Sequence, residues 1–341
     1  MNLFKYGNAL VVLVAGMLVM QGCGQGRDRG AERPTVGFVT NGIASFWVFA
    51  ERGARDAAEE FEVDVAVMMP PDGVAGQKRM VQDLLARQVD GIAITPSDPQ
   101  NQAGLLAEIA ANTHLITHDS DAPESDRLVY IGMDNYDAGR MCGRLLKKAM
   151  PEGGEVVLFI GLLGQLNSDL RRQGVIDELL DRSHDPTRRD PVDEVIEGDT
   201  FTILDTRVDG FDFARAKSQV EEALARYPDI DGMAGLFVYN PPQILEAVRE
   251  AGKLDQVAIV GFDEDDITLQ AIKDGEIAGT IVQNPYRYGY ESVRVLAALA
   301  RGDRSVLPES QIIHIPAREI TAENVDGFRA ETKRLLGEEA N

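Results

Sequence analysis

The chain has 341 residues, of which 44% are hydrophobic and 26% charged, so its length suits two domains and its composition is typical of a packed globular protein. Asp and Glu number 56 against 34 Lys and Arg, and the net charge of −22 argues against a nucleic-acid partner, because phosphate contacts need clustered basic side chains. Two cysteines and four histidines leave little material for a disulfide framework or a structural zinc site, and we expect no metal and no cofactor.

The N-terminus has the pattern of an export signal followed by an anchor. Lys5 precedes an apolar run over 9–20, which is too short to cross a membrane but has the length of a signal-peptide core. The Gly22-Cys23 pair after this run resembles a bacterial lipoprotein processing site, where the peptide is cut before the cysteine and the thiol is lipidated. We therefore predict a lipoprotein signal peptide over 1–22, a membrane anchor at lipidated Cys23, and a polar tether over 23–34.

An ordinary secretory signal with an incidental cysteine is the alternative to the lipoprotein prediction. If Cys23 is lipidated, Cys142 is the one remaining free thiol. It lies in a helical pattern over 141–150, and we expect it to be a small buried hydrophobic side chain.

From residue 35 onward, short apolar runs alternate with amphipathic helical patterns, and the series restarts near residue 154. We predict strands over 35–39, 63–68, 91–94, 115–117, 128–131, 155–160, 201–205, 232–238 and 257–260. We predict helices over 46–61, 76–88, 100–111, 141–150, 170–180, 213–227, 242–251 and 267–274. This alternation predicts an α/β fold of two doubly wound parallel sheets, each covered by helices.

Polar and aromatic residues follow the predicted strands, where ligands bind in sheets of this kind. The candidates are Phe46, Trp47, Asp119, Asn167, Arg171, Asp209, Phe211, Asn240 and Asp263. Carboxylates accept hydrogen bonds from hydroxyl groups, arginine and amides donate them, and an aromatic ring covers the C–H face of a sugar, so the set suits a neutral polyol. The alternative for any single Asp or Asn is a turn or a helix cap.

Over residues 35 to about 320, the order and spacing of these groups resemble the periplasmic sugar-binding proteins of the ribose-binding type, which share their fold with LacI-type repressors. The most specific motifs are Val260-Gly261-Phe262-Asp263 and Gly279-Thr280-Ile281-Val282-Gln283-Asn284-Pro285, followed by Asp119 after Ile116 and by Asp134-Asn135-x-x-Ala138-Gly139. The resemblance implies two lobes that close on a ligand.

The resemblance also implies roles for individual residues. Phe46 and Trp47 would sandwich the sugar, and Asp119 and Asp263 would be the carboxylates that bind it. Asn240 and Gln283 would be the ligand-binding amides, and Arg171 the ligand-binding arginine, with Asn167 one turn before it. Asp209 or Phe211 would belong to the loop that closes over the ligand. The chain departs from the family at Ala44, Ser120, Asp169 and Pro241-Pro242. These departures weigh against ribose itself and leave the mode of binding intact.

By the same resemblance the chain crosses between lobes near 133–134, 283–284 and 310–311, which makes a three-segment hinge. We predict an N-terminal lobe of 35–133 plus 285–310, a C-terminal lobe of 134–284 plus 311–320, and a C-terminal tail over 321–341 that forms a surface helix or a frayed end.

The enzyme alternatives have little support in the sequence. No H-E-x-x-H, P-loop or G-x-S-x-G motif occurs, and His114 and His118, four residues apart on a predicted strand, would lie about 13 Å apart, too far to share a metal ion. A polysaccharide hydrolase using Asp119 and Asp263 is a remote alternative. A repressor is disfavoured because an export signal stands where DNA-binding helices would be.

The functional prediction is a non-enzymatic, monomeric, periplasmic lipoprotein that captures a monosaccharide or related polyol for an ABC importer. Its partners would be the permease, the ATPase subunit and, through Cys23, a membrane. The alternative is a sensor component that presents a sugar or a furanosyl signal molecule to a membrane receptor or histidine kinase.

Overall fold

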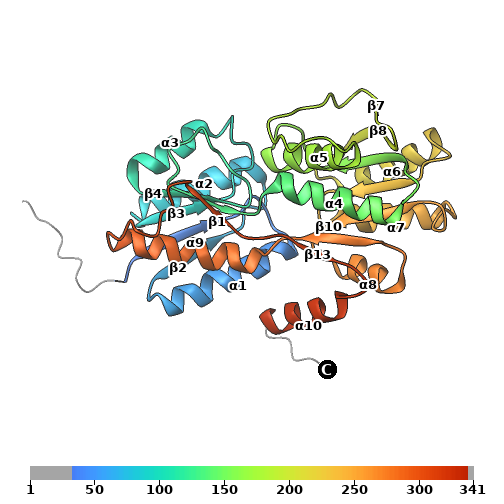
Figure 1. The fold of residues 1–341 in the computed structure, drawn as a ribbon. Coiled ribbons are helices and arrows are strands. Elements are labelled where there is room, and N and C mark those ends of the chain that lie inside the picture. Colours follow the sequence, from blue (N-terminus) through green and yellow to red (C-terminus); the bar gives the residue numbers. More distant parts are fainter. Residues whose placement is uncertain (1–32, 337–341) are drawn as a thin grey trace, which may run out of the picture. The chain divides into compact units, whose positions relative to one another are not determined.

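Two sheets organise residues 33–336, the part of the chain that our computed structural model describes (Figure 1). The predicted signal peptide, Cys23 and nearly all of the predicted tether lie outside the described residues. Within residues 33–336, no helix has the length and apolar character needed to cross a membrane. We call each sheet with the helices packed on it a lobe.

The first sheet has six strands in the order β12-β5-β4-β3-β1-β2, and every pair in it is parallel. Its strands are β1 (Thr35–Val39), β2 (Asp64–Met68), β3 (Gly91–Ile94), β4 (His114–His118), β5 (Tyr130–Gly132) and β12 (Ile312–His314). The helices of this lobe are α1 (Ser45–Glu60), α2 (Gly73–Ala86), α3 (Ala103–Asn112) and α9 (Pro285–Ala300). Every residue of β3 is buried, as expected for a central strand covered on both faces.

The second sheet has seven strands in the order β13-β11-β10-β9-β6-β8-β7, with antiparallel pairs only at its two edges. Its strands are β6 (Gly154–Ile160), β7 (Ile196–Glu197), β8 (Phe201–Val208), β9 (Gly232–Gly235), β10 (Ala258–Phe262), β11 (Gly279–Val282) and β13 (Arg318–Ile320). Its helices are α4 (Asn135–Ala149), α5 (Leu166–Leu179), α6 (Phe213–Arg226), α7 (Asn240–Glu250), α8 (Asp266–Asp274) and α10 (Val325–Leu336). The predicted α/β fold with two parallel-rich sheets is confirmed.

The last crossing between sheets differs from its predicted place. We expected residues 311–320 in the C-terminal lobe, but β12 pairs with β5 in the first sheet, and only β13 belongs to the second. The chain therefore crosses between His314 and Arg318. The physical reason is packing, since Ile313 and Ile315 join the apolar core of the first lobe and β12 covers an edge of β5 that would otherwise be unpaired.

Helix pairs approach closely at glycines, in the same way in each lobe. In the first lobe α1 and α9 meet where Gly53 faces the carbonyl of Tyr286 and Gly289 faces that of Ala50. In the second lobe α4 and α5 meet where Gly139 faces the carbonyl of Arg171. A Cβ atom at any of these glycines would collide with the facing backbone, so these contacts fix the distance between the two helices of each pair.

Candidate functional site

A cavity of about 750 Å³ lies where the carboxyl ends of strands from both sheets converge. Eight of the ten predicted binding residues line it: Phe46, Trp47, Asp119, Asn167, Arg171, Phe211, Asp263 and Gln283. Because the strand that precedes each of these groups is buried, the polar side chains come together at the one place where the two sheets expose their ends. Asp209 and Asn240 do not line the cavity.

Asp119 and Asp263 are held by the same local construction, one in each lobe. Each follows a strand, β4 or β10, with a left-handed backbone: φ is 59° at Asp119 and 63° at Asp263. Each amide continues the sheet by donating to the neighbouring strand, at Ile131 or Ile281. Each carbonyl accepts from a hydroxyl group of that strand, 2.8 Å from Tyr130 and 2.9 Å from Thr280. The left-handed turn directs both carboxylates into the cavity instead of along the sheet.

The two carboxylates have raised pKa values. Burial raises the pKa of Asp119 to about 7, an effect that the Arg171 guanidinium opposes and Asp263 reinforces. Burial likewise raises the pKa of Asp263, against the opposing effects of Arg171 and of hydrogen bonds from Gln283. The Gln283 amide donates to Asp263 at 2.8 Å, whereas the Asp119 carboxylate accepts no hydrogen bond from any described residue. Asp119 is therefore the acceptor with the most unused capacity in the cavity.

Arg171 is a fixed donor between these acceptors. Its Nε donates to Asn135 Oδ1 at 2.9 Å and its Nη1 to the carbonyl of Leu236 at 3.0 Å. Asp263 Oδ2 lies 3.9 Å from Nη1, and the guanidinium carbon lies over the rings of Phe237 and Phe262, 5.1 and 4.8 Å from their centroids. Nη2 donates to no described residue, so it is available to a ligand.

Phe46 and Trp47 both line the cavity and both belong to the apolar core of the first lobe. Their rings meet edge to face at 4.8 Å, and the Trp47 indole donates to Asn41 Oδ1 at 3.0 Å. Behind them His118 stacks on Phe38 at 4.1 Å, and burial lowers the pKa of this imidazole to about 3, so it is neutral. His118 thus supports the wall as a neutral ring. The residues that the structure describes contain no cluster of three metal-ligating side chains.

Asp209 and Asn240 support the wall from behind instead of lining the cavity, and their predicted contact with ligand stays a prediction. Both are at most 2% exposed, and they pair through Asn240 Nδ2 and Asp209 Oδ2 at 2.9 Å. Asp209 Oδ1 also accepts from the Tyr239 hydroxyl at 2.5 Å and from the Phe211 amide at 2.8 Å. The two side chains do not line the cavity because each buried polar group makes its hydrogen bonds with other groups of the protein. Together they fix the two aromatic side chains that do line the cavity.

Several residues of the site were not predicted. Asn135 lies in the Asp134-Asn135-x-x-Ala138-Gly139 motif, but its contact with Arg171 joins α4 to α5 and has no sequence signal. Phe237 and Tyr239 come just after β9, and two aromatic side chains at the carboxyl end of a strand are the signal that could have revealed them. Phe213, Asp98 and Asn101 also line the cavity and were not predicted.

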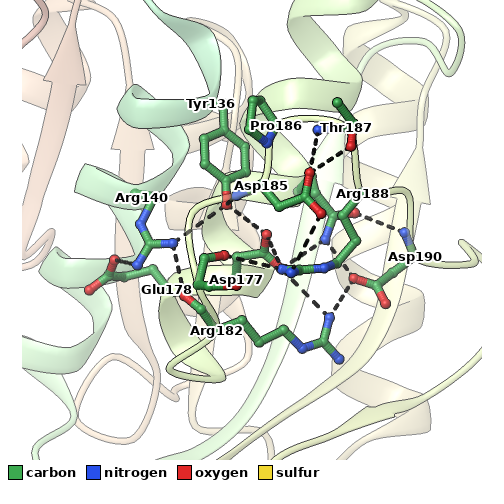
Figure 2. Close-up of polar contacts among 12 residues, drawn as sticks. Tyr136, Arg140, Asp177, Glu178, Arg182, Asp185, Pro186, Thr187, Arg188 and Asp190 are labelled. Atoms are coloured by element: carbon green, nitrogen blue, oxygen red, sulfur yellow. Dashed lines mark hydrogen bonds and ion pairs between the residues drawn. The ribbon is translucent and has the colours of Figure 1, made fainter.

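A network of charged side chains joins α4, α5 and the loop that follows α5 (Figure 2). At its centre is Asp177, which is fully buried and accepts from the Tyr136 hydroxyl at 2.7 Å and from Gln173 at 3.0 Å. Arg188 pairs with it at 2.6 Å and Arg182 at 3.6 Å. The contacts tie the loop over 181–195 to α4 and α5.

Arg172, the neighbour of Arg171 on α5, connects this network to the helix that carries Arg171 into the cavity. Arg172 donates to the carbonyls of Asp190 and Pro191, at 2.9 and 2.6 Å, and to Thr206 Oγ1 at 2.9 Å. Asp190 in turn pairs with Arg182 at 2.7 Å. The loop, strand β8 and α5 are therefore joined by one continuous set of polar contacts.

Replacing Asp177 with alanine is expected to lower the free energy of unfolding by about 2 kcal/mol, because it leaves a buried tyrosine hydroxyl and Arg188 without their nearest acceptor, while Arg182 keeps Asp190. The effect stays below that of a fully buried pair because Arg182 and Arg188 are 29% and 26% exposed. Chemical denaturation measures it. Asp229→Ala, at an exposed position, is the control and should change the midpoint little. Equal midpoints for both variants would show that the network does not stabilise the fold.

Comparisons with known proteins agree with this architecture. Residues 36–304 match the profile of the periplasmic binding protein domain. The ribose import binding protein RbsB of Salmonella typhimurium is 26% identical over 264 residues, which are 76% of this chain and 82% of that protein. The D-ribose/D-allose-binding protein of Pseudomonas aeruginosa is 21% identical over 303 residues, 85% of this chain and 90% of that protein.

Solved structures show the same fold. An ABC transporter solute-binding protein from Burkholderia graminis, crystallised in complex with D-arabinose, superposes with a TM-score of 0.77 and 27% identity, over 86% of this chain and 97% of that one. The glucose-galactose binding protein GanP of Geobacillus stearothermophilus gives a TM-score of 0.77 at 24% identity, over 86% and 99%. The match over 36–304, together with two parallel sheets whose ends meet at one cavity, shows that the chain belongs to the periplasmic binding protein family, as the resemblance predicted.

Proposed function

We propose that the protein is the substrate-binding component of an ABC importer and that it captures a monosaccharide or related polyol in the cavity between its lobes. One observation carries the proposal: Asp119 and Asp263, one from each sheet, line a single cavity with Arg171 and aromatic rings. Relatives named for ribose and allose, and a neighbour crystallised with D-arabinose, support the ligand class.

The chemistry of the cavity favours a neutral, hydroxyl-rich ligand. Sugar hydroxyls donate to the buried carboxylates and accept from Arg171 Nη2, and each such charge-assisted bond is stronger than a neutral one. A hydrolase would need one carboxyl group as acid and a second as base or nucleophile. Asp263 is already engaged by Gln283 and lies beside Arg171, which supports a binding role over a catalytic one.

The proposal extends to an anchored periplasmic protein. Signal removal before Cys23 and lipidation of its thiol would leave the polar tether over 23–34 between the membrane and the binding lobes. Expression of the native chain and a Cys23→Ser variant, followed by fractionation and mass spectrometry of the N-terminal peptide, tests this. A Cys23→Ser variant that stays in the membrane fraction to the same extent as the native chain contradicts the anchor.

Thermal unfolding against a panel of pentoses, hexoses, deoxy-sugars and polyols tests the ligand class. A ligand at a hundred times its dissociation constant stabilises the protein by about 2.7 kcal/mol, which corresponds to a midpoint shift of about 5 °C for a chain of this size. One sugar that shifts the midpoint while its epimer does not would identify a specific binder. No shift with any sugar or polyol would contradict the proposal.

The affinity for sugar is expected to fall as pH drops below 7. Burial raises the pKa of Asp119 to about 7, and hydroxyl donors from the ligand favour its ionised form, so binding releases a proton and weakens by up to about tenfold per pH unit below that value. Asp263, whose pKa is also raised, acts in the same direction. Calorimetric titrations between pH 5 and 8 measure the effect, and a pH-independent affinity would show that the ligand does not bond to these carboxylates.

A further inference from the structure

The outer part of the cavity has two walls of different chemistry, and a single sugar ring bound at Asp119, Arg171 and Asp263 leaves this part unexplained. Nine large hydrophobic side chains are exposed among residues 33–336, and six of them line this cavity: Ile43, Val74, Leu162, Leu163, Phe211 and Phe213. Phe213 is 60% exposed, against 5% or less for Asp119 and Asp263. Apolar surface that gathers at one place in this way marks a site of contact.

The wall from the second lobe is a series of aromatic rings that starts at Arg171. Phe237 lies over the guanidinium, Tyr239 stacks on Phe237 at 6.3 Å and 27°, and Phe213 stacks on Tyr239 at 5.0 Å and 24°. The Tyr239 hydroxyl is held by Asp209, which fixes the ring. The series therefore leads from the buried arginine to an exposed ring at the outer end.

The wall from the first lobe places the polar side chains of Asp98 and Asn101 beside the exposed Ile43 and Val74, and its polar part is rigid. The Asp98 carboxylate accepts from the amide and side chain of Asn101 at 3.1 and 2.7 Å, and these bonds lower its pKa, so it stays ionised. Buried Gln102 accepts from the Asp98 amide at 2.8 Å and donates to Gln77, which donates to the strand-end carbonyls of Thr40 and Thr95. The loop that carries Asp98 and Asn101 is thus fixed to the ends of β1 and β3.

We propose that these two walls form an outer subsite for a second sugar ring, so that the ligand is a glycoside or short oligosaccharide whose terminal ring occupies the Asp119–Arg171–Asp263 site. This inference rests on the proposed function. A pyranose has an apolar C–H face and a polar edge, which match an aromatic wall facing a carboxylate and an amide. The cavity volume of about 750 Å³ falls within the range of roughly 300–1,000 Å³ of pockets that bury drug-sized ligands.

Isothermal titration calorimetry of the mature chain tests the subsite with defined sugars. The single-ring probes are D-xylose, D-glucose, D-galactose, D-arabinose and D-ribose. The disaccharide probes are xylobiose, cellobiose, maltose and lactose, whose component rings are D-xylose, D-glucose and D-galactose. We expect one disaccharide to bind at least about tenfold more tightly than its component monosaccharide. Phe213→Ala should reduce this ratio about tenfold, and Phe213→Tyr should preserve it, because tyrosine keeps the stacking face.

Ile267→Ala is the matched control, since Ile267 is 55% exposed and lies outside the cavity, and it should leave both affinities unchanged. Monosaccharide binding with no gain from any second ring, or a disaccharide gain that Phe213→Ala does not reduce, would overturn the subsite and leave the proposed function standing. Binding of none of these sugars would overturn both.

Discussion

Replacing Asp119 with asparagine is expected to weaken sugar binding by at least about 100-fold and, at pH 8, to stabilise the ligand-free protein. The loss follows because two hydroxyl groups bonded to a charged acceptor contribute about 1.5–3 kcal/mol each, and 1.4 kcal/mol corresponds to a factor of ten. Asparagine tolerates the left-handed backbone at this position, where φ is 59°, so the substitution adds no strain of its own.

The gain in stability follows from the direction of the pKa shift. Burial raises the pKa of Asp119 from 3.8 to about 7, so the folded state binds a proton that the unfolded state does not between these values. The stability that the group contributes is present below about pH 4 and is lost as pH rises through 7. At pH 8 the native chain buries an ionised carboxylate with no hydrogen-bond donor among the described residues, and asparagine removes that cost.

Thermal unfolding at pH 5 and pH 8, with and without the sugar found in the panel, measures both effects. Asp181→Asn is the matched control, since this residue has a φ of 52° and an exposed side chain, and only a surface pair with Lys147 is lost. A variant at Asp119 that binds as tightly as the native chain would show that the cavity is not the ligand site. A lower midpoint at pH 8 would show that Asp119 stabilises the empty protein.

The position of the central binding groups follows from the hydrophobic pattern alone. A polar residue directly after a continuous buried run must emerge at the carboxyl edge of a parallel sheet, and this argument places Asp119 after β4 and Asp263 after β10. The same argument could not say whether a polar group faces ligand or protein. Asp209 and Asn240 also follow strands, yet they bond to each other, because their partners come from a different strand and are not visible in local sequence.

Short edge strands were the least predictable part of the fold. β12 spans only Ile312–His314, too few residues to show a period, and its place beside β5 depends on contacts with chain more than 180 residues away. Helix α9 was not among the predicted helices, and a Pro and a Gly within its first five residues weaken the sequence signal for a helix. In the structure Pro285 occupies the first turn, where no amide donor is needed, and Gly289 is required by the close approach of α1.

Replacing Gly139 with alanine is expected to destabilise the protein by about 3 kcal/mol and to weaken sugar binding at the same time. A Cβ at this position would collide with the carbonyl of Arg171, which is backbone and unable to rotate away. Helices α4 and α5 would have to separate, and α5 carries both Arg171 and Asn167 into the cavity. The Asn135–Arg171 hydrogen bond, which spans the same two helices, would lengthen.

Gly104→Ala is the matched control, because Gly104 also lies in a helix but has open space where its Cβ would be. There alanine should stabilise the protein by about 0.5–1 kcal/mol through its helix propensity and leave binding unchanged. Chemical denaturation and calorimetry of the two variants separate propensity from packing, since the substitution is the same and the expected signs are opposite. If Gly139→Ala behaves like Gly104→Ala, the helices have room to adjust, and the guanidinium of Arg171 is positioned by its hydrogen bonds and stacking partners without the help of the α4–α5 contact.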